Sequence, residues 1–562
     1  MTDAAAAESQ AIHLDPRQRL EILGAILLAL FLFALDQTVV GTALPRIVTD
    51  LHGDTLYTWA VTIYLLTSTV SGPIYGKLSD LFGRRPIIIW AVGLFLVSSV
   101  FAGLSQEMWQ FVLFRGLQGL GGGAVFPVAL AVVADLYTPV ERGKYLGLFG
   151  AMFGLSSLIG PAIGGLITDN FTWHWIFFVN VPVAAISLVI LWRLLPAIRH
   201  PDAARHIDYL GAAVFTAAIT PFLIGLTNKQ TPGAQWTDPA VGGLIALGLV
   251  IAAVFIWIES RVPEPIVRLD LFRNSSFTIS VAAMFLAAFG FFGAIIFLPR
   301  WFQTVAGLSA TQSGYSLLPI IGALIISATA SGQIVARTHR YKLLIFVSML
   351  LLAAGLFLLT NLRADTDRPL LWVWMAVAGF GIGPSFAVFA LVVQNTVAPQ
   401  VIGVATSSLT FFQQIGGTIG LTIAGTVLAD KIASDLPPRL VAAGVPPAYL
   451  TQFGPGSKLD LTGTGDLGQR ILAATPPAQQ PLVQPLIPGI VQAVHESFSI
   501  AIASTFWVSI VAALVAAVFV LFLREVPMRE TFEMVPEDGA TPGPQASDQA
   551  GPGTERGPAT GA

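Results

Sequence analysis

Asp36 is a carboxylate placed inside an apolar run, where a charge is energetically expensive. It lies within residues 22–42, most of which are apolar. A charge at the centre of a bilayer costs about 2.5–3.5 kcal/mol on insertion scales, so such a residue usually has a role. Apolar surroundings favour the protonated form of a carboxylic acid, while a nearby guanidinium favours the ionised form. We therefore predict that Asp36 binds and releases a proton; the alternative is a structural ion pair or a hydrogen bond to a neighbouring helix.

Among the Lys and Arg residues, only Arg115 falls within the body of an apolar run. It begins the segment Arg-Gly-Leu-Gln-Gly at 115–119, whose glycines allow a neighbouring helix to approach closely. A guanidinium is always charged and must face the protein interior or a wet cavity. We expect Arg115 to tune Asp36 or to pass a proton by way of Gln118 and water. The alternative role is to hold helices together through backbone carbonyls.

The segment GKLSDLFGRRP at 76–86 combines glycines and charges between two apolar runs. Its glycines and proline favour a tight turn, and Asp80 can cap a helix end and pair with Arg84 or Arg142. Breaking a few polar contacts shifts an equilibrium between two states, so the segment is suited to latch one conformation. The alternative is a basic loop that only sets topology. The predicted latch residues are Gly76, Asp80, Gly83, Arg84, Arg85 and Arg142.

Glycines and a proline crowd the apolar run at 144–168. Proline removes a helical hydrogen bond and glycines permit close packing, so this helix is expected to bend or to pack tightly. The close packing is either a gating device or ordinary helix contact. The residues concerned are Gly154, Gly160, Pro161, Gly164 and Gly165.

Polar and aromatic residues within the apolar runs are candidates for contact with a transported molecule. Each of them can equally be a packing residue, and Trp or Tyr near the end of a run can be an interfacial anchor. The candidates are Gln37, Thr38, Trp59, Tyr64, Gln394, Phe411, Phe412, Gln413 and Gln414.

The composition identifies the environment of these residues. Of the 562 residues, 54% are hydrophobic and 11% are charged, whereas soluble domains have about 45–50% and about 25%. This excludes a disordered chain and argues against a soluble enzyme or a nucleic-acid binder. The chain has no cysteine, so it has no disulfide and no thiolate metal site. His495-Glu496 lacks the second histidine of a zinc-protease motif, and no phosphate-binding loop is present, so no metal site and no ATP hydrolysis are expected.

Fourteen apolar runs are long enough to cross a bilayer as helices, since a core of about 30 Å needs about 20 residues. They lie near 22–42, 57–76, 86–104, 109–133, 144–168, 175–196, 210–227, 239–258, 276–298, 314–336, 342–361, 370–394, 402–428 and 498–523.

Lys and Arg are distributed unequally between the two sets of loops. If the N-terminus is inside, the inner loops and tails carry most of them, and the short outer loops carry few. We therefore predict that both termini face the cytosol. The Lys and Arg of the outer loops are Arg46, Lys229, Arg300, Arg363 and Arg368.

The chain repeats itself weakly at a spacing near 256 residues, with Leu-Pro-Arg at 44–46 and 298–300 and glycine clusters at 119–123 and 379–383. Two six-helix halves with an inserted pair between them follow from this spacing. At the aligned motif positions the ionisable residues occur in the first half only, since Asp36 aligns with Gly290 and Arg115 with Met375. The predicted division is a cytosolic tail at 1–21, a first half at 22–196, an inserted segment at 197–275, a second half at 276–525 with an external loop at 429–497, and a disordered tail at 526–562.

These motifs together resemble those of the major facilitator superfamily, in particular its fourteen-span drug:proton antiporters. Residues 35–45 resemble the first-span signature, 76–86 the loop motif and 115–119 the proton-transfer motif. Residues 160–165 resemble the antiporter motif of the fifth span, and 173–182 the segment that enters the sixth. The resemblance covers about residues 22–525. It implies the major facilitator fold and export, without specifying the cargo.

We expect a proton-coupled exporter of hydrophobic or amphipathic compounds, a multidrug efflux protein of a bacterial cell membrane that works by alternating access. The first rival is export of an endogenous lipid or secondary metabolite by the same fold, and the second is a membrane receptor or enzyme that transports nothing. No cofactor is expected, because a proton gradient drives the cycle. The expected partners are membrane lipid, protons and a small substrate, with an accessory envelope protein left open, no nucleic acid, and a monomeric state.

Overall fold

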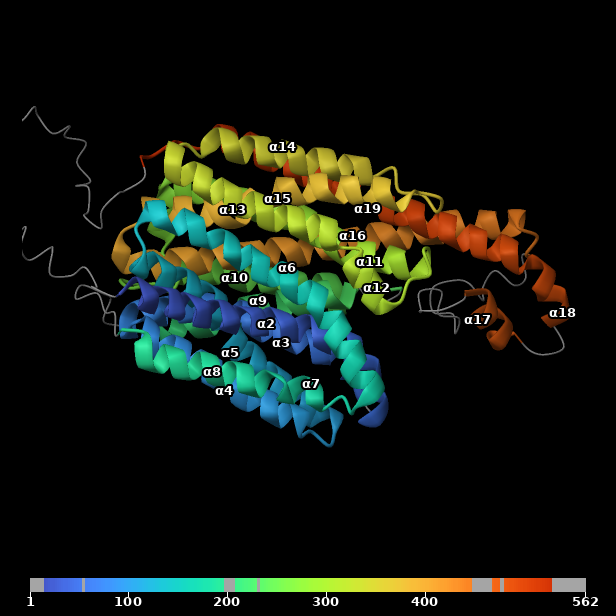
Figure 1. Ribbon diagram of the computed structural model, residues 1–562, viewed down its shortest axis with the longest axis horizontal. Coiled ribbons are helices and arrows are strands. Elements are labelled where there is room, and N and C mark those ends of the chain that lie inside the picture. The colour runs from blue at the N-terminus through green and yellow to red at the C-terminus, as the bar shows by residue number, and fades with distance from the viewer. Residues whose placement is uncertain are drawn as a thin grey trace, which may run out of the picture.

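The computed structural model describes residues 15–52, 56–196, 208–229, 233–446, 467–475 and 480–527. Within these ranges the regular secondary structure is entirely helical, and the long helices run side by side (Figure 1). A helix satisfies its own backbone hydrogen bonds, which lipid cannot do for it. The chain is therefore an all-α polytopic membrane protein, as predicted.

The first half of the chain forms the first six spans. Gly83 joins the second to the third with a φ of +92°, in the left-handed region that glycine adopts readily. Glu141 accepts a hydrogen bond from the backbone N–H of Thr138 at 3.0 Å where the fifth span begins. The helices are α2 (Pro16–Asp50), α3 (Tyr57–Phe82), α4 (Arg84–Gly103), α5 (Met108–Leu136), α6 (Pro139–Asn170), α7 (Trp175–Phe178) and α8 (Asn180–Leu194).

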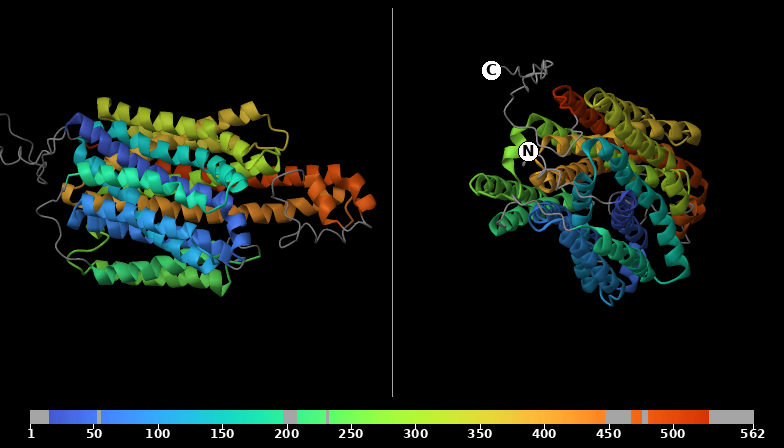
Figure 2. Two further views of the ribbon diagram at one scale, coloured as in Figure 1. Left: turned by 60° about the horizontal axis from the view of Figure 1, so that its bottom comes forward. Right: turned by 60° about the vertical axis from the view of Figure 1, so that its left-hand side comes forward.

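The inserted segment contributes α9 (Tyr209–Lys229) and α10 (Leu244–Glu259), the latter preceded by a π-helical turn, η2 (Pro239–Gly243). These two helices pack closely against each other, and α9 also contacts α3 and α16. Figure 2 shows the pair in green at the side of the bundle. A 3₁₀ turn, η3 (Leu269–Arg273), leads from the pair into the second half.

The second half repeats the arrangement of the first with six further spans and short connecting helices. Its elements are α11 (Ser275–Thr304), α12 (Ala310–Tyr315), α13 (Leu318–Thr338), α14 (Lys342–Leu359), α15 (Arg368–Thr396), η4 (Pro399–Val401), α16 (Ile402–Ala442), α17 (Leu467–Ala474), α18 (Gln480–Val483), η6 (Gln484–Leu486) and α19 (Ile487–Leu521).

Fourteen long helical segments within the described residues correspond to the fourteen predicted spans, with α7 and η2 counted together with the helices that follow them. Twelve of these segments are long and apolar enough to cross a membrane by length and composition alone. The other two segments, α3 and α6, lie between other spans. Helix α3 packs against α5 and α16, and α6 packs against α2 and α13.

The glycine clusters of the predicted repeat have equivalent packing roles in the two halves. A methyl group at Gly121 of α5 would come 2.6 Å from the backbone nitrogen of Phe95 in α4. In the second half, a methyl group at Gly381 of α15 would come 2.2 Å from the backbone nitrogen of Leu352 in α14. Both pairs of helices therefore touch backbone to backbone, which only glycine permits.

The two halves meet at the end of the bundle that contains Arg84, Leu136, Thr338 and Thr396, called here the predicted cytoplasmic end. A methyl group at Gly332 of α13 would lie 1.6 Å from the carbonyl oxygen of Gly143 in α6, so these helices cross in backbone contact. Gln394 of α15 donates a hydrogen bond to the carbonyl oxygen of Leu130 in α5 at 3.2 Å. The opposite end is called the predicted external end.

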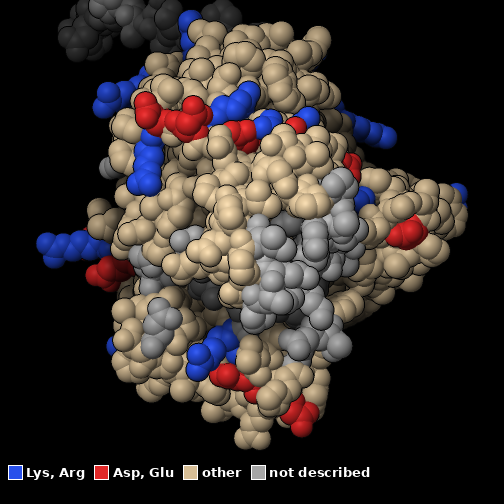
Figure 3. All heavy atoms as spheres, turned by 90° about the vertical axis from the view of Figure 1, so that its right-hand side faces the viewer, with Lys and Arg blue, Asp and Glu red and all other residues tan. Residues whose placement is uncertain are grey.

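The prediction that residues 429–497 form a loop is wrong for the part that the structure describes, because this part is largely helical. Helix α16 continues to Ala442, and α19 already begins at Ile487. Apolar residues of α16, α17 and α19 form a separate small core, with Leu440, Ile471 and Ile490 each about 2% exposed or less. The Pro- and Gly-rich composition obscured this spacing. We call residues 429–446, 467–475 and 480–497 the helical extension. It projects from the bundle at the right of Figure 1. Figure 3 shows the end of the molecule that carries this extension, with charged side chains scattered over it.

The first helix also begins earlier than expected. Helix α2 starts at Pro16 rather than near residue 22, and the side chain of Asp15 accepts a hydrogen bond from the backbone nitrogen of Arg17 at 3.0 Å. Pro and Asp are common at a helix start, so the charged segment belongs to the helix rather than to the predicted tail. The rest of that tail, 1–14, and the predicted disordered tail beyond residue 527 lie outside the described residues.

Candidate functional site

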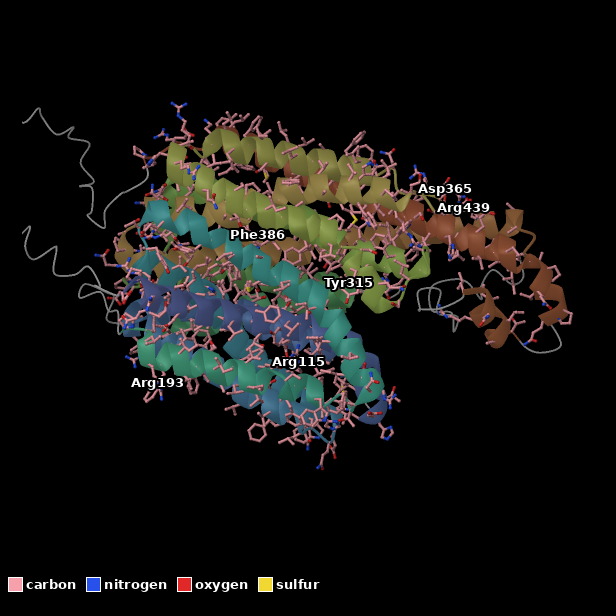
Figure 4. All side chains as sticks on the ribbon, viewed as in Figure 1. Arg115, Arg193, Tyr315, Asp365, Phe386 and Arg439 are labelled. Carbon is pink, nitrogen blue, oxygen red and sulfur yellow. The ribbon has the colours of Figure 1, made fainter. Side chains whose placement is uncertain are left out.

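The predicted proton site is assembled inside the first half, where α2 and α5 face each other. The side chain of Arg115 forms an ion pair with Asp36, and both side chains are no more than 2% exposed. Arg115 lies well within the bundle, among the helices of the first half (Figure 4). Because a guanidinium cannot lose its proton in a protein, the charge state of this pair depends on the carboxyl group.

Gln118 completes a closed set of polar contacts with this pair. Its amide nitrogen donates to Asp36 Oδ1 at 2.8 Å, and its carbonyl oxygen accepts from Arg115 Nη1 at 2.7 Å. Arg115 and Gln118 lie three residues apart on α5, so they share one face of that helix. The three residues therefore share one connected set of polar contacts; that they act together in proton transfer stays a prediction.

Asn180 is a member of this site that the sequence analysis missed. Its amide nitrogen donates to Asp36 Oδ1 at 3.3 Å and to Ser99 Oγ at 3.1 Å. Ser99 in turn donates to the carbonyl oxygen of Phe177 at 3.1 Å, which links α4, α7 and α8 to the carboxylate. Asn180 is a polar residue within an apolar run, and this feature could have identified it as a site residue, as it identified Gln37.

Tyr64 of α3 covers the guanidinium from the other side. The Cζ atom of Arg115 lies 4.1 Å from the centre of the Tyr64 ring, a cation–π contact. The hydroxyl of Tyr64 donates to the carbonyl oxygen of Phe33 at 3.4 Å, and the side chain is 1% exposed. Tyr64 was predicted as a cargo contact; the structure places it beside the charged pair.

The predicted latch joins the two halves at the predicted cytoplasmic end. Asp80 accepts hydrogen bonds from the backbone nitrogens of Gly403 at 3.0 Å and Val404 at 2.8 Å, at the start of α16. It also forms an ion pair with Arg84. A carboxylate at the first amides of a helix is stabilised by those amides and by the helix dipole. The contact therefore connects α3 of the first half to α16 of the second.

Arg84 is held by a second carboxylate, Asp135 of α5, which the sequence analysis missed. Its Nε atom lies 2.8 Å from Asp135 Oδ2, and its Nη1 atom donates to Ser79 Oγ at 2.9 Å. The side chain of Arg84 is 1% exposed. Since Asp135 follows a long apolar run, it carried no spacing signal that pointed to Arg84.

The other predicted latch residues surround this contact with different roles. Arg142 donates to the carbonyl oxygen of Tyr137 at 2.8 Å and also to that of Ala134, so it closes the turn between α5 and α6. Arg85 donates to the carbonyl oxygen of Trp192 at the end of α8. A methyl group at Gly76 would come 2.7 Å from the carbonyl oxygen of Gly403, so glycine allows α3 and α16 to touch.

The glycine-rich motif lies along α6, between α2 and α13. A methyl group at Gly160 would come 2.0 Å from Thr38 Oγ1 of α2, and one at Gly154 would come 2.4 Å from Ile321 Cγ2 of α13. Thr38 donates to the carbonyl oxygen of Ser156 at 3.0 Å, which fixes the same crossing. Pro161, Gly164 and Gly165 continue the helix toward the predicted external end.

The remaining cargo candidates do not gather in one place. Gln394 lies at the predicted cytoplasmic end, and Trp59 is 38% exposed near the start of α3. Gln414 accepts a hydrogen bond from Thr69 of α3 at 2.9 Å between the halves. Four candidates are half-buried or buried along α2 and α16, namely Gln37, Phe411, Phe412 and Gln413.

Phe411 and Phe412 line an apolar cavity of about 350 Å³ between α16, α3 and the inserted pair. Phe215 of α9, Phe255 of α10 and Phe272 of η3 complete its aromatic wall. The cavity is thus bordered by all three parts of the chain.

Comparison with known proteins agrees with this architecture. The family model of the Major Facilitator Superfamily matches residues 26–421. The multidrug transporter protein MdtP of Bacillus subtilis (strain 168) is 36% identical over 512 residues, which are 91% of this chain and 94% of that protein. The tetracenomycin C resistance and export protein of Streptomyces glaucescens is 31% identical over 524 residues, covering 92% of this chain and 93% of that protein.

Among solved structures, the proton:xylose symporter XylE bound to 6-bromo-6-deoxy-D-glucose superposes with a TM-score of 0.57. The alignment covers 91% of this chain and 97% of that chain at 14% identity, which indicates a common fold. With two helical halves that meet at one end, and with a family match across most of its length, the chain belongs to the major facilitator superfamily.

Proposed function

We propose that this chain is a proton-coupled exporter of hydrophobic or amphipathic compounds, and that it acts on several unrelated molecules. The observation that carries the proposal is the buried network of Asp36, Arg115, Gln118 and Asn180, a titratable acid held next to a permanent cation. The names of the two relatives above, a multidrug transporter and a resistance and export protein, support the direction of transport and the type of cargo.

A proton that binds Asp36 replaces the ion pair with a neutral acid beside a cation. Arg115 then keeps its contacts with Gln118 and with the Tyr64 ring but loses its counter-charge. The free-energy balance between the two orientations of the halves changes because one state accommodates the unpaired guanidinium better than the other. Each charge moved across the membrane supplies about 2.3 kcal/mol per 100 mV, which suffices to accumulate a cargo on one side.

The test is dye efflux from proteoliposomes under an imposed pH gradient. The Asp36→Asn variant should reduce gradient-driven efflux to the level of protein-free vesicles, because an amide cannot release a proton. Asp50→Asn is the matched control: Asp50 lies on the same helix, but its side chain is 44% exposed and pairs with Arg46 at 3.7 Å. Equal gradient-driven efflux by the Asp36→Asn protein and the wild type would refute the coupling role.

A second candidate function is the export of a secondary metabolite or lipid made by the same cell. The relative named for tetracenomycin C resistance and export favours it, as does the apolar cavity beside the inserted pair. The test compares the extracellular metabolites and the dye sensitivity of the wild-type host with those of a strain that lacks this protein. Loss of one secreted product without a change in dye sensitivity would support metabolite export over multidrug efflux.

We further propose a bacterial cell membrane with both termini in the cytosol, no cofactor, and a monomer as the working unit. The family and fold indicate a transporter rather than an enzyme. A receptor or enzyme without flux would leave a preloaded dye gradient in proteoliposomes unchanged, whereas a transporter would dissipate it.

A further inference from the structure

Two buried carboxylates lie at the base of the inserted pair, outside the site described above. Asp208 directly precedes α9 and is 9% exposed, while Glu259 is the last residue of α10 and is 2% exposed. A methyl group at Gly211 would come 2.3 Å from Asp208 Oδ2 and 3.0 Å from Glu259 Oε1, so both side chains border the same small space.

Among the described residues, each carboxylate has one oxygen that accepts a hydrogen bond and one that has no partner. Asp208 Oδ1 accepts from the backbone nitrogen of Gly211 at 2.6 Å, and Glu259 Oε1 accepts from that of Ile266 at 3.3 Å. Asp208 Oδ2 and Glu259 Oε2 are buried and have no partner among the described residues. Two neighbouring ionised carboxylates with unpaired buried oxygens are unfavourable, and one proton held by the pair removes most of that cost.

The two carboxylates lie at opposite kinds of helix end. Asp208 precedes the first turn of α9, where a free backbone N–H group and the helix dipole stabilise a negative charge. Glu259 lies in the last turn of α10, where the carbonyl groups disfavour a negative charge. Burial and the neighbouring Asp208 act on Glu259 in the same direction as this helix end, and they outweigh the backbone N–H groups of Ile266 and Val267 and the charge of Lys77.

The charged groups around the pair connect it to α3. Lys77 of α3 is 5% exposed and acts electrostatically on Glu259, as does Asp208. Lys77 is also influenced by Glu264, Arg268 and Asp80. Because Asp80 makes the contact between the halves and lies three residues after Lys77, a charge that appears on Glu259 acts on the helix that carries the latch.

We propose that Glu259, in partnership with Asp208, is a second proton-binding site of this protein, placed at the predicted cytoplasmic end of the inserted pair. When Glu259 is ionised, its negative charge strengthens the attraction between the inserted pair of helices and Lys77 of α3. When Glu259 is protonated, that attraction is weaker. The inference concerns residues outside the Asp36 network, so it holds or fails independently of the proposed function.

Infrared difference spectroscopy of the full-length protein in lipid tests it, with the pH raised from about 5 to about 9. The wild type should lose a C=O stretching band of a buried carboxylic acid as the pH rises. Glu259→Gln should lack that component, because an amide has no such proton. Asp208→Asn should keep the component but shift its midpoint to lower pH values, because the neighbouring negative charge is lost.

We expect the shift to lower pH, because the like charge acts directly on the proton and Asp208 caps only its own helix. Asp36→Asn is the control, and the component assigned to Glu259 should survive in it. An unchanged band in Glu259→Gln, or a midpoint in Asp208→Asn that stays in place or moves upward, would overturn the proposal. Dye efflux by Asp36→Asn is a separate measurement, so failure of the proposed function is recognised independently.

Discussion

Asp36 and Asp50 lie on the same helix but differ in how much their charge costs. Asp36 is buried and receives hydrogen bonds from Arg115, Gln118 and Asn180, whereas Asp50 meets Arg46 at the surface. Surface pairs contribute about 0–1 kcal/mol, while breaking a buried pair by removing one partner costs about 3–5 kcal/mol. Loss of the Asp36 charge would therefore disrupt a buried pair, whereas loss of the Asp50 charge would disrupt only a surface pair.

The Asn180→Leu substitution should slow gradient-driven efflux. It removes an amide that donates to Asp36 Oδ1 inside the buried network. A hydrogen bond to a charged group contributes about 1.5–3 kcal/mol, so its loss should lower the efflux rate several-fold. The measurement is dye efflux from proteoliposomes under an imposed pH gradient.

Ser99→Ala is the control for this prediction. Ser99 accepts a hydrogen bond from Asn180 and makes none to Asp36 among the described contacts, so its loss should slow efflux less than loss of Asn180 does. An identical efflux rate for wild type and Asn180→Leu would show that the asparagine only packs.

The crossing of α6 and α13 shows what glycine does at the scale of an element. At Gly143 and Gly332 the two backbones touch, and one turn further along α6 a methyl group at Gly147 would come 2.7 Å from the backbone nitrogen of Thr329. Such an approach maximises dispersion contacts between helices that lipid cannot drive together. The contact also means that the halves must separate here for the predicted cytoplasmic end to open.

The Gly332→Ala substitution should therefore destabilise the crossing. The added methyl group would meet the carbonyl oxygen of Gly143, and overpacking of this kind costs about 1–3 kcal/mol. Gly322→Ala on the same helix is the control, because no atom lies within 4 Å of its added methyl group. Thermal unfolding in detergent should show a lower Tm for the first variant only, and an equal Tm for both would contradict this account.

At the scale of the whole molecule, polar contacts at the predicted cytoplasmic end join the two halves, in addition to the packing of α6 against α13. Asp80 links α3 to α16, and Gln394 links α15 to α5. Gly76 of α3 allows α3 and α16 to approach each other closely. Contacts of this kind are exchanged when the halves rock about the midplane. The described arrangement is thus closed at the predicted cytoplasmic end.

Asp80→Asn should shift the population toward states that are open at this end, because an amide loses the ion pair with Arg84 and one acceptor for the α16 amides. The chain has no cysteine, so a single Ser407→Cys, at a buried position where α16 meets Gly76 of α3, reports on this end without background. Labelling of that cysteine by a maleimide should become several-fold faster when Asp80→Asn is added.

Asp365→Cys, at an exposed position in the loop before α15, is the matched reporter at the other end. Its labelling rate should not increase with Asp80→Asn. If both reporters speed up equally, the substitution has loosened the whole protein and the latch interpretation is wrong.

The sequence alone determined the membrane fold, the fourteen spans and the core of the site. Spans follow from runs of apolar residues, and a charge inside such a run is conspicuous because lipid makes it costly. Asp36, Arg115 and the loop at 76–86 were identified for this reason. Motifs of this density also indicated the family, which the comparison confirmed.

Only the tertiary structure decided which residues meet. Asn180, Ser99 and Asp135 come from helices far apart in the chain, and nothing in their local spacing specifies the partner. The pairing of Asp80 with the start of α16 and that of Asp208 with Glu259 likewise depend on how helices dock. Docking is decided by side-chain shape and glycine contacts over whole helix faces, which a linear pattern of apolar residues does not encode.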